Sequence, residues 1–154
     1  MKRTNLLRIG AIVPLAFLLL WGVSAQADEE LTFTDVRAQT AEFMRYYEEI
    51  ELDADQAAIF QEALTPLPAP CCSDRSALTC CCPCNQARTW WGLTKHLIVH
   101  HGYDVEQTRA KVVEWFEFTH PDGEREGRSC YAGRCPLPFS KDGCGGMRPD
   151  HVAF

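Results

Sequence analysis

Nine cysteines provide most of the chemistry that this 154-residue sequence offers. They form three groups: Cys71 and Cys72; Cys80, Cys81, Cys82 and Cys84; and Cys130, Cys135 and Cys144. Neighbouring Cα atoms lie about 3.8 Å apart, whereas a disulfide joins Cα atoms about 4.4–6.8 Å apart. Adjacent cysteines are therefore expected to have different partners. Because nine is an odd number, at least one sulfur lies outside any intramolecular disulfide.

Cys81 and Cys84 have the spacing that a single turn closes, and this spacing serves redox pairs and metal sites alike. Cys84 directly precedes Asn85, which we predict to be the N-cap of a helix over residues 86–101. The dipole and the N–H groups at a helix N-terminus stabilise a thiolate, which is the reactive form of cysteine. We therefore predict Cys81 and Cys84 to be the catalytic residues of a thiol–disulfide exchange.

Binding or transfer of a soft metal is a second interpretation of the same cysteines. Thiolates and imidazoles suit Cu(I) and zinc, so copper or zinc is the expected metal. The predicted ligands are drawn from Cys71, Cys72, Cys80, Cys81, Cys82, Cys84, His100 and Cys144. His96 and His100, four residues apart on one predicted helix, can also share a metal, or they belong to a polar helix face.

A structural role for all the cysteines is the third interpretation. A small exported domain buries little apolar surface, and each disulfide adds about 2–4 kcal/mol to its stability. The chain would then be a disulfide-stapled structural or interaction module.

The first 27 residues predict a secretory signal peptide. A basic start with Lys2 and Arg3 is followed by an apolar run over residues 9–23 and by an Ala-x-Ala pattern ending at Ala27. An uncleaved membrane anchor is the alternative, but the apolar run is shorter than the roughly 20 residues of a spanning helix. We expect cleavage, export to the periplasm or the extracellular space, and no membrane span in the mature chain. Disulfides persist in such a compartment.

Composition divides the mature chain at residue 70. Residues 28–70 hold 11 acidic and two basic residues and no cysteine, which predicts an acidic helical arm. Residues 71–154 hold ten acidic and ten basic residues and every cysteine, which predicts a Cys-rich domain. The mature chain has 12 basic and 21 acidic residues, a net charge of −9. This charge argues against a nucleic-acid partner, since phosphate contacts need a basic surface.

Apolar periodicity and capping residues predict four helices. They cover about residues 35–50, residues 53–64 with Asp53 as N-cap, residues 86–101 stopping at Gly102, and residues 104–118. Asp104 and Gln107 resemble a capping box at the start of the last helix. The last two helices form a hairpin over residues 86–118. We expect Trp90, Trp91 and Trp115 to lie in its core.

The predicted fold is mostly α. It is a small helical hairpin or bundle with a Cys-rich, irregular C-terminal tail over residues 123–154, because these residues are rich in Gly, Pro and Cys. No segment alternates apolar and polar residues over a useful length, so we predict no sheet.

Residues 81–118 resemble two exported families. The segment 81–86 (CCPCNQ), followed by a helix and the turn at 102–106 (GYDVE), resembles the CcmH-type thioreductases of cytochrome c maturation. That resemblance implies a three-helix bundle in which Cys81 and Cys84 form the redox pair, and a partner protein that carries thiols or a disulfide. Residues 70–72 (PCC) are similar to the start of the exported PCYCGC-motif proteins, a family without an assigned activity.

Overall fold

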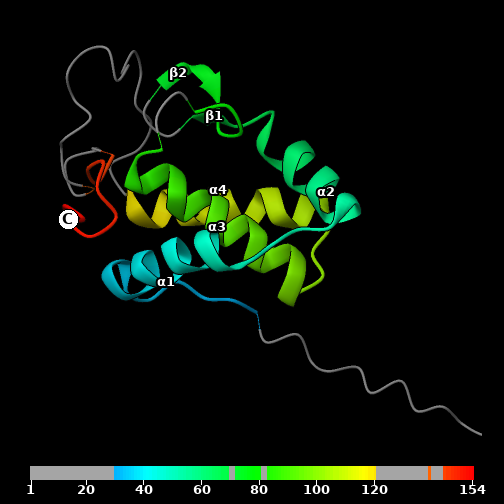
Figure 1. Cartoon of the computed structure of the whole chain (residues 1–154), viewed down its shortest axis with the longest axis horizontal. Coiled ribbons are helices and arrows are strands. Elements are labelled where there is room, and N and C mark those ends of the chain that lie inside the picture. The colour runs from blue at the N-terminus through cyan, green and yellow to red at the C-terminus, as the bar shows by residue number, and fades with distance from the viewer. Residues whose placement is uncertain (1–29, 70–71, 81–82, 121–138, 140–143) are drawn as a thin grey trace, which may run out of the picture.

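The computed structural model describes residues 30–69, 72–80, 83–120, 139 and 144–154. These residues form four helices and a two-stranded sheet (Figure 1). Their bounds are α1 Val36–Glu49, α2 Ala54–Leu64, β1 Pro68–Ala69, β2 Cys72–Ser76, α3 Asn85–His100 and α4 Val105–Thr119. The prediction of a mostly helical protein is confirmed. In this part of the chain, no helix is long and apolar enough to cross a membrane.

Several predictions concern segments outside these residues. The signal peptide, the stop after α4 and the greater part of the irregular tail lie there, as do Cys71, Cys81, Cys82, Cys130 and Cys135. The backbone of Cys72 lies in β2. In residues 144–154, the structure has a single isolated bridge between Arg148 and His151 and no helix or strand.

Local side-chain hydrogen bonds explain where α2 and α4 begin. Each starts with a complete capping box, formed by Asp53 with Gln56 and by Asp104 with Gln107. In such a box the two side chains accept hydrogen bonds from N–H groups that the helix leaves without partners. The second box is the one that the sequence predicts. The helices accordingly lie close to their predicted bounds.

The start of α3 corrects one prediction. The N-cap is Cys84 and not Asn85, because Cys84 has extended backbone angles (φ −68°, ψ 166°) and its sulfur accepts the N–H of Ala87. Asn85 is already the first residue of the helix, and its fully buried side chain bonds to the C-terminal segment instead.

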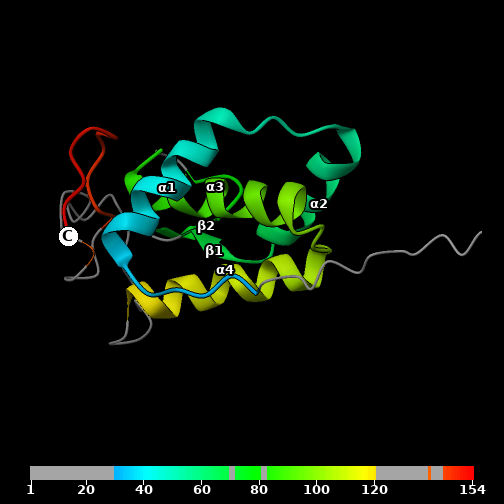
Figure 2. The same cartoon turned by 90° about the horizontal axis from the view of Figure 1, so that it is seen from below.

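The helix α3 lies between α1 and α4 in the view of Figure 2. The buried core draws on all four helices and consists of Phe43, Leu64, Ala77, Trp90, Leu93, Leu97, Val112 and Trp115. Two of the three predicted core tryptophans are therefore confirmed as buried, while Trp91 is half-buried at the edge of this core. The boundary at residue 70 marks a change in composition, and the helices on both sides of it share one core.

A small sheet joins α2 to α3, so the prediction of no sheet is wrong. β1 and β2 run antiparallel, with Pro68 opposite Ser76 and Ala69 opposite Cys72. The strands have two and five residues, too short for an alternating pattern to stand out. Just after β2, the carbonyl of Ala77 accepts a 2.9 Å hydrogen bond from the indole of Trp91, which ties the sheet to α3.

Candidate functional site

Cys84 begins α3 and is fully buried. Its Sγ accepts a hydrogen bond from the backbone N–H of Ala87 at 3.4 Å, in the way that the oxygen of a Ser or Asp N-cap does. The N-terminus of this 16-residue helix carries a partial positive charge. The helix dipole therefore acts on the sulfur of Cys84, which lies one position closer to the helix than the sequence predicts.

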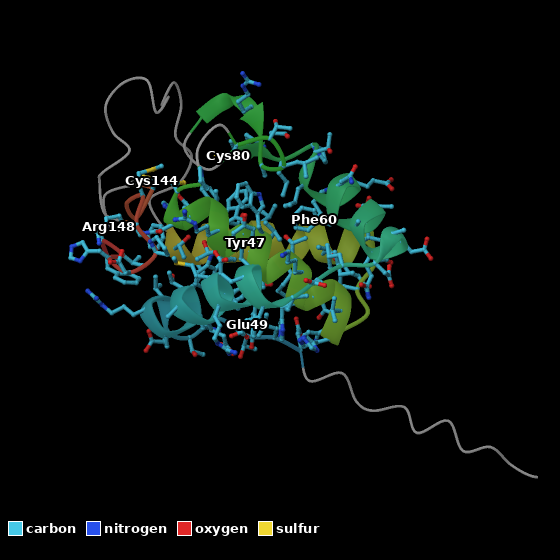
Figure 3. The ribbon with its side chains drawn as sticks, in the orientation of Figure 1. Tyr47, Glu49, Phe60, Cys80, Cys144 and Arg148 are labelled. Carbon is cyan, nitrogen blue, oxygen red and sulfur yellow. The ribbon has the colours of Figure 1, made fainter. Side chains whose placement is uncertain are left out.

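Three cysteines gather at this end of α3. Cys84 and Cys144 are both buried in one small cluster with Ala69 and Ala87, and Cys80 packs against that cluster from a partly exposed position. In Figure 3, Cys80 and Cys144 lie on the side of the molecule where α3 begins. The sequence analysis named all three cysteines but did not predict that Cys144 would lie beside Cys84. We call these three residues the cysteine cluster.

The backbone of residues 144–146 covers the first turn of α3. The N–H of Asn85 donates to the carbonyl of Gly146 at 2.9 Å, and the N–H of Gln86 donates to the carbonyl of Cys144 at 3.0 Å. A helix N-terminus usually presents these donors to solvent or to an anion. Here both N–H groups donate to carbonyls of the protein itself. This end of the helix therefore interacts with the sulfur of Cys84 and does not offer these donors to an external anion.

The side chain of Asn85 fastens the same segment. Its amide donates to the carbonyls of Gly145 and Arg148, both at 2.9 Å. Gly145 and Gly146 have φ of 68° and 93°, a left-handed conformation that favours glycine. A Cβ on Gly145 would also lie 2.4 Å from the ring of Phe139. Two glycines and one buried amide therefore hold Cys144 at the start of α3.

His120 is a buried residue at the same end that the sequence analysis missed. It follows α4, is 2% exposed, and stacks on Phe116 with ring centroids 4.8 Å apart. Its Nδ1 lies 2.7 Å from the hydroxyl of Thr119, and both ring nitrogens lie 3.3 Å from the amide nitrogen of Gln86. Through Gln86, whose N–H binds the carbonyl of Cys144, the histidine is linked to the backbone of the cysteine cluster. In the sequence, the only feature that marks His120 is its position directly before Pro121.

His100 cannot share a metal with the cysteine cluster. It is the last residue of α3, and Cys84 caps the first turn. At about 1.5 Å per residue, the two are separated by roughly 24 Å along the helix axis. His100 and Cys84 therefore cannot be ligands of the same metal ion. In the parts of the chain that the structure describes, no three His, Cys, Asp or Glu side chains are grouped so as to hold a metal ion.

Comparisons of the chain with protein-family models, with curated proteins and with solved structures find no match.

Proposed function

We propose that this protein carries out thiol–disulfide exchange in an exported compartment, using Cys81 and Cys84. The observation that supports this most is the sulfur of Cys84, which lies at the N-cap of α3 and accepts the N–H of Ala87. Interaction of an anion with a helix N-terminus contributes up to about 2 kcal/mol in a partly buried setting. This interaction offsets part of the cost that burial imposes on a thiolate, and thiolate is the form that attacks a disulfide.

In this proposal Cys84 carries out the second step, and its burial supports that role. A fully buried sulfur is out of reach of a disulfide on another protein, whereas it can attack a neighbour in its own chain. Cys81, three residues earlier, is then the residue that meets the partner. This order of events requires that Cys84 remain covered, and Cys144, which is buried in the same cluster, contributes to that cover.

The exchange takes place in two steps. The thiolate of Cys81 attacks one sulfur of a partner disulfide, forms a mixed disulfide, and releases the other partner sulfur as a thiolate. The thiolate of Cys84 then attacks the sulfur of Cys81, which forms the Cys81–Cys84 disulfide and releases the second partner thiolate. Both partner sulfurs take up protons from water. The partner gains two electrons, and the Cys81–Cys84 pair loses them.

Serine variants separate the two roles. Cys84→Ser keeps a good N-cap, since serine is among the preferred N-cap residues. With a peptide disulfide as substrate, this variant should accumulate a mixed disulfide on Cys81, because the sulfur that resolves it is missing. Cys81→Ser should neither turn over nor accumulate a mixed disulfide. Non-reducing mass spectrometry of the alkylated reaction mixture identifies the species.

Cys130→Ser is the matched control, because it makes the same chemical change outside the pair. It should turn over like the wild-type chain and trap nothing. Turnover that survives in Cys81→Ser, or a trapped species on Cys130 in place of Cys81, would contradict the proposed roles.

A further inference from the structure

Hydrogen bonds from the first two turns of α3 hold the segment of residues 144–154 in place. The amide of Asn85 donates to two carbonyls of the segment, and a guanidinium nitrogen of Arg88 donates to a third, that of Met147, at 3.0 Å. The same nitrogen of Arg88 also donates to Oδ1 of Asn85 at 3.2 Å. Because Oδ1 accepts this hydrogen bond, the amide nitrogen of Asn85 is turned toward the segment. The start of α3 therefore presents a matched set of donors to the segment.

The segment is also closed on itself and reaches α1. The N–H of Ala153 donates back to the carbonyl of Gly145 at 2.8 Å, which joins its two ends. The guanidinium of Arg37 on α1 lies 4.3 Å from the centre of the Phe154 ring, a cation–π contact. Figures 1 and 2 show the segment, drawn red, at the end of the molecule where α3 begins. A segment closed in this way leaves α3 as one unit when it undocks.

Docking of the segment takes up two N–H groups that the start of a helix leaves without partners. An N-cap side chain usually accepts the N–H of the second or the third helical residue. Cys84, the N-cap of α3, accepts from the third, Ala87. The N–H of the second, Gln86, donates to the carbonyl of Cys144, and the N–H of Asn85 also donates to the segment. Cys84 therefore shares the donors of its own helix with this segment.

Two physical effects make the docked state less favourable for a thiolate at Cys84 than the undocked state. The carbonyls of Cys144 and Gly146 lie against the positive end of α3 and oppose its dipole. Burial beside Cys144 also removes water from the sulfur, and the loss of water disfavours the charged form. Undocking reverses both effects, because it frees the N–H of Gln86 for the N-cap sulfur and lets water reach that sulfur.

We propose that segment 144–154 is an autoinhibitory element, which holds Cys84 in a weakly nucleophilic state while it is docked and activates this sulfur when it is released. The inference rests on the proposed exchange only in taking Cys84 as a reactive residue. In that reaction, docking keeps Cys84 from attacking a partner disulfide ahead of Cys81, because the thiolate and not the thiol is the nucleophile. The property that the segment regulates is the thiolate fraction of Cys84.

Gly145→Val tests the proposal, because it should release the segment without changing any residue of α3. A Cβ at Gly145 would lie 2.4 Å from the ring of Phe139, and its φ of 68° is strained for a β-branched residue. On the fully reduced chain, the rate at which iodoacetamide alkylates Cys84 is measured against pH by peptide mass spectrometry. Because cysteines at helix N-termini titrate between about 3.5 and 7.5, against about 8.5 for a free thiol, the midpoint of this profile should fall by about one pH unit or more. Below both midpoints, a fall of about one unit is a tenfold gain in thiolate fraction.

Gly102→Val is the matched control. It makes the same change at another left-handed glycine, with a φ of 64°, at the opposite end of α3, where a Cβ meets no atom within 4 Å. Its midpoint should equal that of the wild-type chain. Far-UV circular dichroism should show that both variants keep the helices, and hydrogen exchange of residues 144–154 should be faster only in Gly145→Val. Asn85→Leu, which removes the amide that fastens the segment, should move the midpoint in the same direction as Gly145→Val.

An unchanged midpoint in Gly145→Val would overturn the proposal even if alkylation became faster, since the segment would then be only a steric cover. An equal fall of the midpoint in Gly102→Val would overturn it too, as would a segment that stays docked in both Gly145→Val and Asn85→Leu. The alkylation of Cys84 requires neither Cys81 nor a partner disulfide. Failure of this inference and failure of the proposed exchange are therefore separate results.

Discussion

Replacing Gly92 with alanine should destabilise the protein more than the same change at the other glycines that the structure describes. A Cβ at Gly92 would lie 1.7 Å from the carbonyl oxygen of Phe43 and 2.9 Å from the backbone nitrogen of Tyr47. Both atoms belong to the backbone of α1, so no side-chain rotation can relieve the contact. The two helices must move apart, and the aromatic core between them must open. Overpacking of a core commonly costs about 1–3 kcal/mol, and we expect a loss of about 3 kcal/mol or more here.

Urea unfolding, followed by tryptophan fluorescence, measures this loss as a change in the free energy of unfolding. Gly102→Ala is the control, because a Cβ at Gly102 meets no atom within 4 Å. Its φ of 64° is left-handed, so this variant should lose only the backbone strain of about 1–2 kcal/mol. A Gly92→Ala variant that unfolds at the wild-type urea concentration would show that α1 and α3 do not pack this closely.

Replacing Asn85 with leucine should release the C-terminal segment from α3. The change removes the two hydrogen bonds from the Asn85 amide, although the carbonyl of Gly145 keeps the N–H of Ala153 and the carbonyl of Arg148 keeps the N–H of His151. A hydrogen bond contributes about 0.5–1.5 kcal/mol to stability. With two hydrogen bonds lost, we expect the docking of residues 144–154 to weaken by about 1–3 kcal/mol. The cover over Cys84 then opens far more often than in the wild-type chain.

Hydrogen exchange of the peptide 144–154, measured by mass spectrometry, reports on this docking. The N–H of Ala153, which donates to the carbonyl of Gly145, should exchange about tenfold faster in Asn85→Leu, because about 1.4 kcal/mol corresponds to a factor of ten. In Arg148→Ala the rate should stay the same, because Asn85 binds the carbonyl of this residue and its side chain pairs only with the exposed Asp150. Equal rates in Asn85→Leu and the wild-type chain would mean that the amide does not hold the segment.

Local signals account for the parts of this fold that the sequence predicts. The capping box of Asp104 and Gln107 and the glycine stop at Gly102 depend on residues within one turn of each other. The same holds for the placement of Cys84 at the start of a helix. These features can be inferred without knowing what lies on the other side of the molecule.

The remaining features depend on contacts between distant segments. Nothing near Gly92 indicates that a second helix backbone touches it, so its role appears only with α1 in place. Asn85 looks like an N-cap in the sequence, yet its side chain turns to carbonyls about 60 residues away. Cys144 likewise lies beside Cys84 only because distant segments of the chain contact each other.

The histidines at the C-terminal end of α3 combine a feature that local sequence predicts with one that it does not. Helical spacing predicts that His96 and His100 share a face. The nitrogen that directly faces His96, however, comes from His101, one residue beyond the helix. The position of that ring depends on how the chain leaves α3 at its C-cap, and periodicity does not describe that turn.

The reduction potential of the Cys81–Cys84 pair tests the proposed function most directly. The purified chain is equilibrated with thiol–disulfide buffers of known potential, its thiols are alkylated, and the fraction of each cysteine that has reacted is determined by mass spectrometry. Dedicated exchange proteins have potentials between about −270 and −120 mV, and structural disulfides lie below about −300 mV. If the dipole at the start of α3 acts on Cys84 as proposed, the potential lies within the first range, with both cysteines titrating together. A value below about −300 mV, or a disulfide that joins Cys84 to a residue other than Cys81, would contradict the account.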